Sequence, residues 1–276
     1  MKMAMKLAYI GGSYYGFQRQ PGLATIESAL RVALLNIGVE KGDFCYAGRT
    51  DRGVNALGQV VDFYIEEEAE CLARPRVINS RLPPEIWTWA WSKAPYGFSA
   101  RWSAEWREYR YLLYHPGLDL EAMRDAGELL LGAHDFRNFS STKEDTVREV
   151  MRIDIDERNS MVIFDIRAGG FLWNMVRRIA GALEAVGSGL RSLDWIEELL
   201  DSSINRGAPA APPEGLILMD VGYEGLDWQE DPYAKARAAR MLSAMTGRWM
   251  ALAGVAREIE EGMALKQQSS HQQERR

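Results

Sequence analysis

Apolar and polar residues alternate in several short runs along the first two-thirds of the chain. The alternation at residues 5–9, 61–65 and 87–91 has the period of two that is typical of β-strands. Apolar residues that recur three or four positions apart predict helices at residues 26–37 and 121–131. The pattern therefore predicts a chain in which strands and helices are interspersed.

Several local signals refine this assignment. Thr25 and Gly38 flank the first helix as an N-cap and a residue just past its end. Another predicted helix has an apolar face from Leu172 to Val186, which puts Arg177 at the edge of that face. On the predicted strand at 107–112, Arg107, Tyr109 and Tyr111 share one face, and Arg110 points to the other.

Aromatic residues cluster at two places. Trp87, Trp89 and Trp91 line one face of a predicted strand, where they could stack on bases, but packing in the core is the favoured interpretation. The loop at residues 13–21 carries three aromatic side chains with polar ones between them. Base stacking and anchoring of the loop to the core both remain open for it.

The end of the chain has a different pattern. Asp231-Pro232 has the form of an N-cap followed by proline at the first helical position. Apolar residues at helical spacing from 241 to 263 then predict one or two amphipathic helices, with Gly247 as a candidate break. Residues 267–276 are polar and are predicted to be disordered.

Composition and charge restrict the function classes. The chain has 276 residues, 47% of them apolar, and a net charge of −6, which argues against a nucleic-acid partner. The acidic residues are concentrated in one part of the chain, however, since ten of them and only two arginines lie between Arg191 and Asp231. An arginine-lined cleft elsewhere is therefore compatible with the negative net charge.

The cysteines, the histidines and the N-terminal sequence give no indication of a zinc site or of secretion. Cys45 and Cys71 have no metal-like spacing, and the three histidines are scattered, so no zinc site is recognisable. The N-terminus lacks a signal peptide, and no apolar run approaches the length of a membrane span. These features predict a reduced, cytoplasmic compartment and no membrane association.

The strongest candidate for chemistry is the stretch at residues 48–63. Arg49, Asp51 and Arg52 lie in a turn bounded by Gly48 and Gly53, just before a predicted strand. Nearby positive charge favours an ionised carboxylate, which suits a nucleophile or charge stabiliser better than an acid. A plain hairpin turn, with the aspartate capping backbone amides and the arginines solvated, is the alternative that these residues alone leave open.

This stretch resembles the signature of the TruA-type tRNA pseudouridine synthases, and other motifs of that family follow in order between Leu7 and Tyr223. The similar segments are Gly48-Arg49-Thr50-Asp51, Gly53-Val54, Gly58-Gln59-Val60, residues 15–20, Leu82-Pro83, residues 98–101, 107–111, 171–177 and 212–216. Two positions depart from the family pattern, with Gly11 where aspartate is usual and Asn55 where histidine is usual.

The resemblance implies a two-lobed α+β pseudouridine synthase fold, in which each lobe has a mixed or antiparallel sheet flanked by helices, with a cleft between the lobes. The expected division is an N-terminal lobe at 1–104, a C-terminal lobe at 105–225, a helical extension at 226–266 and a disordered tail at 267–276. A homodimer is implied, with no cofactor and no metal. The extension has no counterpart in the family core, so packing on the domain, dimerisation and RNA contact all remain open for it.

The resemblance also implies a reaction and its residues. The family isomerises uridine to pseudouridine at positions 38 to 40 of the tRNA anticodon arm. Asp51 matches the catalytic residue, which would attack either ribose C1′ or uracil C6 after base flipping. Arg49 would assist flipping, Tyr109 would hold the base, and Arg177 would keep Asp51 ionised and oriented.

The residues leave two other functional classes open. A phosphoryl-transfer enzyme could use Asp51 as its nucleophile, but it would need magnesium ligands, and no second acidic cluster accompanies this residue. A non-catalytic RNA-binding protein with the same fold is the third possibility, in which Asp51 would be dispensable.

Overall fold

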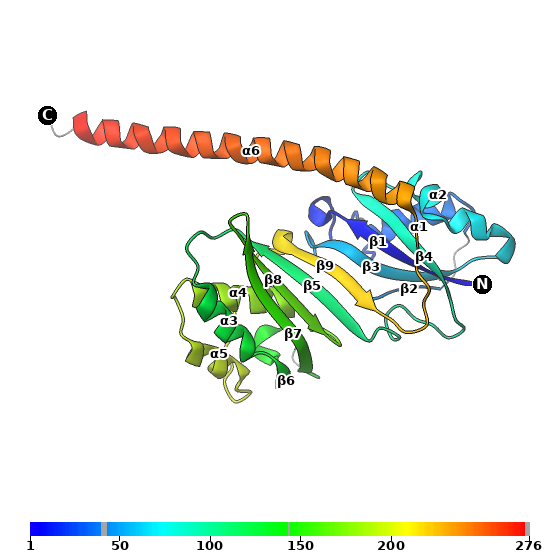
Figure 1. The fold of residues 1–276 in the computed structure, drawn as a ribbon, viewed down its shortest axis with the longest axis horizontal. Helices are drawn as coiled ribbons and strands as arrows, with labels where there is room; N and C mark the ends of the chain where they lie inside the picture. The colour runs from blue at the N-terminus through cyan, green and yellow to red at the C-terminus, as the bar shows by residue number, and fades with distance from the viewer. Residues whose placement is uncertain (40–42, 143, 274–276) are drawn as a thin grey trace. The chain divides into compact units, whose positions relative to one another are not determined.

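The computed structural model describes residues 1–39, 43–142 and 144–273, with side chains up to residue 263 (Figure 1). The chain divides into two compact units, Met1–Asp231 and Pro232–Arg276. The second unit consists of one helix, α6 (Pro232–Gln273), so the backbone is continuous through Gly247 and helical at residues 267–273. Residues 274–276 of the predicted tail lie outside the described residues.

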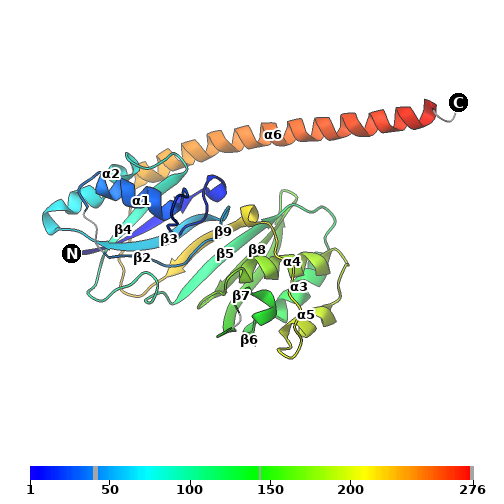
Figure 2. The same ribbon diagram turned by 180° about the vertical axis from the view of Figure 1, so that it is seen from behind.

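A mixed β-sheet runs through the whole first unit (Figure 2). Its described strands are β1 (Lys2–Tyr9), β2 (Phe44–Tyr46), β3 (Asn55–Tyr64), β4 (Ile86–Ala94), β5 (Trp106–Leu113), β6 (Gly132–Asp135), β7 (Val147–Arg158), β8 (Met161–Ala168), β9 (Leu216–Gly222) and β10 (Gln229–Glu230). Their order is β10-β4-β1-β3-β9-β5-β8-β7-β6, with β2 paired to β3. The α+β class with a mixed sheet is confirmed.

The two halves of this sheet meet at a short parallel junction. β3 and β9 pair only through Asn55 with Ile217 and Ala56 with Leu218, whereas the neighbouring pairs β1–β3 and β5–β9 are antiparallel. A polypeptide that leaves the first half after β4 therefore builds β5 to β8 before β9 returns to the centre. Sequence segments far apart thus come together at this junction.

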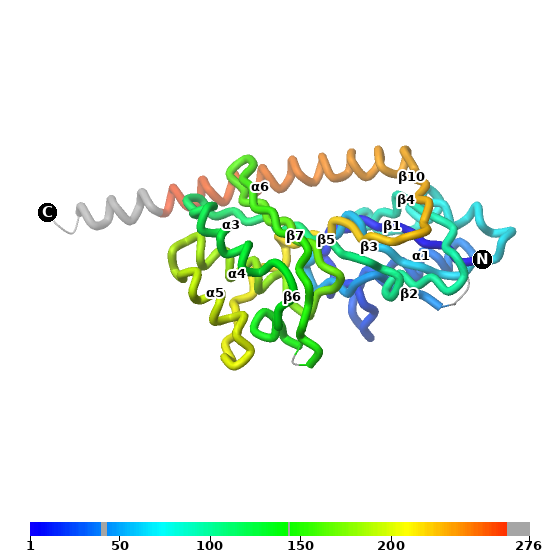
Figure 3. The backbone as a smooth tube through the Cα atoms, turned by 60° about the horizontal axis from the view of Figure 1, so that its bottom comes forward, coloured from blue at the N-terminus to red at the C-terminus, as the bar shows by residue number. Residues whose placement is uncertain are grey.

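The helices of the first unit flank each half of the sheet (Figures 1 and 3). They are α1 (Ile26–Leu35), α2 (Pro75–Asn79), α3 (Leu120–Glu128), α4 (Met175–Gly187) and α5 (Leu193–Leu200), with short 3-10 turns η1 (Gly11–Ser13), η2 (Glu67–Ala73), η3 (Arg137–Phe139) and η4 (Pro213–Gly215). α2 packs against β4, and α3 packs against β7 and α4. The Thr25 side chain accepts a hydrogen bond from Ser28 N, which confirms the predicted N-cap of α1.

The helix expected from Leu172 begins three residues later. Asn174 precedes α4 in the left-handed region, at φ 64°, which interrupts any helix that would include Leu172. Residues before it therefore form a loop, while Met175 and Val176 lie in the first turn and are buried as predicted. This difference decides where the Trp173 side chain lies.

The tryptophans of β4 pack in the core, as favoured from their spacing. Trp87 and Trp91 are 3% and 6% exposed, and Thr88 between them is fully buried. Trp89 Nε1 donates a hydrogen bond to the Leu57 carbonyl oxygen at 2.8 Å. Trp87 and Trp91 are therefore not available for stacking on bases.

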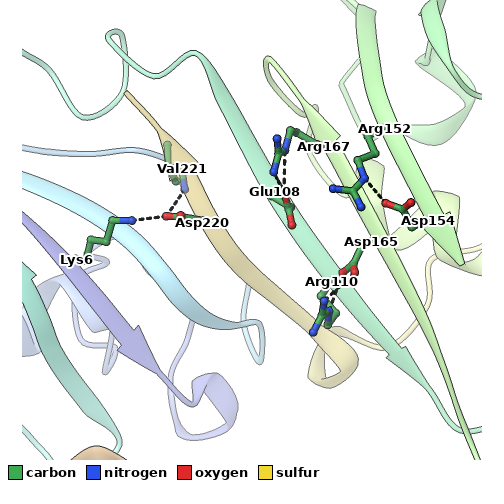
Figure 4. Close-up of polar contacts among 9 residues, drawn as sticks. All are labelled: Lys6, Glu108, Arg110, Arg152, Asp154, Asp165, Arg167, Asp220 and Val221. Atoms are coloured by element: carbon green, nitrogen blue, oxygen red, sulfur yellow. Dashed lines mark hydrogen bonds and ion pairs between the residues drawn. The ribbon is translucent and has the colours of Figure 1, made fainter. Parts of the chain in front are cut away.

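One face of the sheet carries cross-strand ion pairs (Figure 4). Arg110 donates two hydrogen bonds to Asp165, at 2.7 and 2.8 Å, and Glu108 pairs with Arg167. Because side chains alternate along β5, this face is opposite to that of Tyr109, as predicted for Arg110. The Asp165 hydrogen bonds raise the pKa of Arg110, so this face holds fixed charges away from the cavity described below.

Gly58 permits the close approach of β3 to β9, and its substitution tests that constraint. A Cβ atom at position 58 would lie 2.4 Å from the Met219 carbonyl oxygen and 2.8 Å from the Asp220 Cα. Gly58→Ala should therefore force the two strands apart and lower the free energy of unfolding by about 1–3 kcal/mol, measured by urea denaturation. Gly12→Ala is the matched control, since its Cβ would meet open space. Equal urea midpoints for both variants would contradict this account of the junction.

Candidate active site

A cavity of about 670 Å³ opens where loops from both halves of the sheet converge. Its walls come from residues 46–51 and 170–177, together with Gln18, Val54, Arg101, Trp102, Ala104, Arg107, Tyr109, Arg148 and Leu216. All four predicted site residues, Arg49, Asp51, Tyr109 and Arg177, line it. The structure therefore brings together residues that lie up to 128 positions apart in the sequence.

The charge of the cavity wall differs from that of the chain. Asp51 is the one carboxylate among the lining residues, whereas arginines line it at positions 49, 101, 107, 148 and 177. The protein as a whole has a net charge of −6. The arginine-lined cleft expected from the segregated charge is thus present, and it suits a polyanionic ligand.

The loop that carries Asp51 is fixed from both sides of the residue. Thr50 is 3% exposed; its hydroxyl is hydrogen-bonded to the Tyr9 hydroxyl at 2.8 Å, and its carbonyl oxygen accepts from Phe17 N at 3.0 Å. Val54 N donates to the Asp51 carbonyl oxygen at 3.2 Å. The backbone is therefore anchored to the core, and the Asp51 side chain projects to the cavity with 22% of its surface exposed.

Each carboxylate oxygen of Asp51 faces a different partner. Trp173 Nε1 donates a hydrogen bond to Oδ1 at 3.1 Å. Arg177 Nη1 lies 3.8 Å from Oδ2, an ion pair that is longer than a hydrogen bond. Trp173 lies in the loop after β8 and Arg177 lies in α4, so both partners come from segments that flank the second half of the sheet.

Arg177 is itself held by neighbouring groups. Its Nε donates to the Ala211 carbonyl oxygen at 2.8 Å, and its Nη1 donates to Asn174 Oδ1 at 3.1 Å. Ala211 N in turn donates to the Arg177 carbonyl oxygen at 2.9 Å. The guanidinium is therefore oriented before any ligand binds, which is the condition for effective electrostatic stabilisation.

The arginines next to Asp51 in the sequence are placed differently from this pair. Arg52 is exposed and lies over the Tyr15 ring, with 4.4 Å between its guanidinium carbon and the ring centroid. Arg49 is exposed at the cavity wall. Asp51 forms its ion pair with Arg177, which is distant in the sequence, so the neighbouring arginines indicated the site but not the charge partner.

Tyr109 presents a buried aromatic ring to the cavity. It is 8% exposed and packs edge-to-face on Phe171, with 5.2 Å between ring centroids. Burial raises the pKa of its phenol to about 12, so the side chain is neutral at physiological pH. A rigid, uncharged ring at the cavity wall can stack on a planar ligand.

Sequence reasoning missed Arg107 as a site residue. Its guanidinium donates to three carbonyl oxygens within 3.0 Å, those of Ala47, Arg101 and Gly169, and so joins three loops around the cavity. Burial lowers the pKa of this guanidinium. Its position two residues before Tyr109 on the same strand face was the available signal, but carbonyl partners in distant loops leave no trace in a sequence.

Trp173 is the second residue that sequence reasoning missed. Its side chain is 57% exposed although its indole is bonded to Asp51. The Trp173 carbonyl oxygen accepts from Ser140 Oγ and Ser141 N at 3.2 and 3.1 Å, which holds the loop in place. The available signal was Asn174, because asparagine tolerates the left-handed conformation. A left-handed residue at 174 ends the loop there and leaves Trp173 outside the helix.

The two positions that depart from the family pattern contact each other. Gly11 N donates to Asn55 Oδ1 at 3.0 Å, and Asn55 Nδ2 donates to the Glu214 carbonyl oxygen at 2.8 Å. A Cβ atom at position 11 would lie 2.1 Å from the Val54 carbonyl oxygen. Gly11 and Asn55 therefore fit one another and brace the strand that follows the Asp51 loop.

Comparison with known proteins identifies the family. A family model described as "tRNA pseudouridine synthase" matches residues 126–224. The tRNA pseudouridine synthase A of Methanothrix thermoacetophila is 62% identical over 259 residues, 94% of this chain and 97% of that protein. The chain belongs to the tRNA pseudouridine synthase A family. Proteins of the same name from Methanocella arvoryzae and Thermococcus kodakarensis are 45% and 39% identical, over 95% and 87% of this chain and 100% and 91% of their own lengths.

Membership confirms the family resemblance drawn from separated motifs, and with it the enzyme class of tRNA pseudouridine synthase. The match to the Methanothrix protein leaves 6% of this chain uncovered, which is less than the 42 residues of α6. At least part of the C-terminal extension is therefore shared with that relative. Within the described part of the chain, no helix has the length and apolar content to cross a membrane.

Arg107 should be essential to the shape of the cavity. Arg107→Lys keeps the charge, but a single ammonium group cannot donate to three separate loops, so carbonyl oxygens lose their partners. We expect the free energy of unfolding to fall by about 1–3 kcal/mol, measured by thermal denaturation. Arg110→Lys, on the opposite strand face, retains a cation for Asp165 and should cost less than about 1 kcal/mol. Two variants of equal stability would argue against this role of Arg107.

Proposed function

We propose that this chain isomerises uridine to pseudouridine at positions 38 to 40 of the tRNA anticodon arm, with Asp51 as the nucleophile. The observation that carries the proposal is the placement of a single carboxylate in an arginine-lined cavity, between the Trp173 N–H and Arg177. Membership of the tRNA pseudouridine synthase A family supports the substrate and the reaction.

The target uridine has to leave the base stack to reach Asp51. Arg49, exposed at the cavity wall, is suited to assist this flipping and to occupy the space that the base leaves. Tyr109 offers the flipped uracil a neutral aromatic surface, because burial raises the pKa of its phenol to about 12. The remaining arginines of the wall would neutralise phosphates of the flanking nucleotides.

Asp51 then supplies the nucleophilic oxygen, at ribose C1′ or at uracil C6. By either route the N1–C1′ bond breaks and a C5–C1′ bond forms, while C5 loses a proton and N1 gains one. Arg177 would keep the carboxylate oriented, and the Trp173 N–H would fix its rotation. Burial of the site by the bound RNA would strengthen both interactions.

The alternatives have less support. Asp51 is the one carboxylate among the residues that line the cavity, so magnesium-dependent phosphoryl transfer there would need the same side chain as nucleophile and as metal ligand. A purely RNA-binding protein would not need a carboxylate in the centre of its cationic cavity, since it would repel phosphate.

The proposal includes a cellular setting and a partner. The partner is the anticodon stem-loop of tRNA, the chain is a homodimer, and the compartment is the cytoplasm. The free thiols of Cys45 and Cys71 are compatible with a reducing compartment.

The decisive test is tritium release from tRNA that contains 5-tritiated uridine, in the presence of EDTA. The parent chain should release tritium, and Asp51→Asn should lower the rate about 10³-fold or more while tRNA binding changes little. Asp165→Asn, on the opposite sheet face, is the matched control and should retain full activity. Undiminished release by Asp51→Asn, or no release by the parent across a set of tRNAs, would overturn the proposal.

The Trp173 hydrogen bond predicts a separate effect on the chemical step. Trp173→Phe retains an aromatic ring but removes the N–H donor, so the single-turnover rate should fall about 10-fold or more, as expected for a hydrogen bond to a charged group. The tRNA dissociation constant should stay within about twofold, because the ring is retained. Trp173→His, which restores a ring N–H, should recover part of the rate. If Trp173→Phe matches the parent and only Trp173→Ala is impaired, the residue stacks on RNA instead.

A further inference from the structure

Helix α6 carries an unusually regular row of apolar side chains. Their spacing alternates between three and four residues, which places them at positions a and d of a heptad repeat; they are Leu242, Met245, Trp249, Leu252, Ala256, Ile259 and Met263. Trp249, Leu252, Ile259 and Met263 are 47% to 65% exposed. We call these seven residues the α6 seam. A strict 3.5-residue repeat is the pattern of a helix that pairs with another helix.

Basic and acidic residues are separated along α6. Five basic residues and no acidic residue lie between positions 232 and 257, and Glu258, Glu260 and Glu261 follow. The first part of α6 is therefore basic, and the stretch at 258–261 is acidic. An antiparallel helix of the same sequence alongside would bring acidic residues of one copy near basic residues of the other.

We propose that α6 pairs with α6 of a second copy of this chain, in antiparallel orientation through the α6 seam. The inference deepens the homodimer of the proposed function and rests on that part of it. In one register that aligns the two seams, Trp249 packs opposite Ile259, Met245 opposite Met263, and Leu252 opposite Ala256. Each residue then meets a partner from the same short list, as two-fold symmetry requires.

Charge selects this partner and this orientation. In the register given above, Glu258, Glu260 and Glu261 of one helix lie along positions 247–250 of the other, where Arg248 is the basic residue. A parallel pair would place basic against basic and acidic against acidic. An RNA backbone would be attracted by the basic segment but repelled by the three glutamates, and it would leave the apolar seam exposed.

The first test measures the mass of the full chain in solution by sedimentation equilibrium. The parent should have twice the chain mass of 31.2 kDa. Leu252→Lys combined with Ile259→Lys places four ammonium groups in the paired seams and should weaken the dimer by about 100-fold or more. Met250→Lys is the matched control, because Met250 is 70% exposed but lies outside the seam, and its dimer should be unchanged. Circular dichroism establishes that each variant retains its helix content.

The second test determines orientation by disulfide formation, in a chain whose Cys45 and Cys71 are replaced by serine. Met245→Cys and Met263→Cys variants should form a crosslinked dimer when they are mixed and oxidised. Each variant alone should remain uncrosslinked, since an antiparallel pair separates identical positions. Efficient crosslinking of either variant with itself would indicate a parallel pair and overturn the proposal.

The outcomes separate this inference from the proposed reaction. A dimer that survives Leu252→Lys with Ile259→Lys would show that another surface mediates dimerisation. A monomeric parent would overturn both the homodimer and the pairing of α6, and if these two substitutions then weakened tRNA binding, α6 would be an RNA contact. Tritium release is measured on the same samples, so loss of the α6 pair is distinguished from failure of the synthase assignment.

Discussion

The short parallel pairing of β3 with β9 is the constraint on which the cavity depends. Asp51 lies four residues before the first paired residue of β3, and η4 (Pro213–Gly215) leads directly into β9. The segment before η4 accepts the Arg177 hydrogen bond through Ala211 and the Tyr111 hydroxyl bond through Pro212. A shift at this junction would therefore move the carboxylate and its cation relative to one another. The junction consists of only two residue pairs, and Gly58 allows the two strands to approach closely there.

Electrostatic segregation is a second consequence of the same arrangement. The cavity face has one carboxylate among five arginines, whereas the opposite face of the sheet neutralises its charges in pairs such as Arg110 with Asp165. Acidic residues concentrate in the last part of the first unit, at 191–231. A protein with negative net charge can thus present a cationic surface to a nucleic acid. The electrostatic potential close to a surface depends on where the charged side chains lie rather than on the net charge of the protein.

Most of the fold could be predicted because its signals are local. Alternation predicted β1, β3, β4 and β5, and Thr25 marks the start of α1 through a hydrogen bond three residues away. The start of α4 could not be obtained in this way, because apolar periodicity continues through Leu172 while the left-handed Asn174 interrupts the helix. That one backbone conformation turns Trp173 toward Asp51, so an error of three residues in a helix boundary concealed a site residue.

The site residues, like the helices and strands, could be predicted only where their signals are local in the sequence or belong to a known family pattern. Asp51 and Arg49 were found because they share a loop, while Arg177 and Tyr109 came from resemblance to a family rather than from spacing. Arg107 escaped both routes, since its partners are backbone carbonyl oxygens that any sequence could supply. Interactions between a side chain and a distant backbone leave no compositional signature, and they are the ones that shape this cavity.

The two oxygens of Asp51 are not equivalent, and this difference bears on the proposed reaction. Oδ1 accepts the Trp173 hydrogen bond, which withdraws electron density from it, whereas Oδ2 lies at 3.8 Å from Arg177, beyond hydrogen-bonding distance. In the proposed reaction Oδ2 is therefore the oxygen placed to attack, because among the described residues no hydrogen bond occupies its lone pairs. Arg177, held by Ala211 and Asn174, then provides positive charge without occupying the lone pair that attacks. The asymmetry orients the nucleophile before RNA binds, which reduces the reorganisation that the chemical step requires.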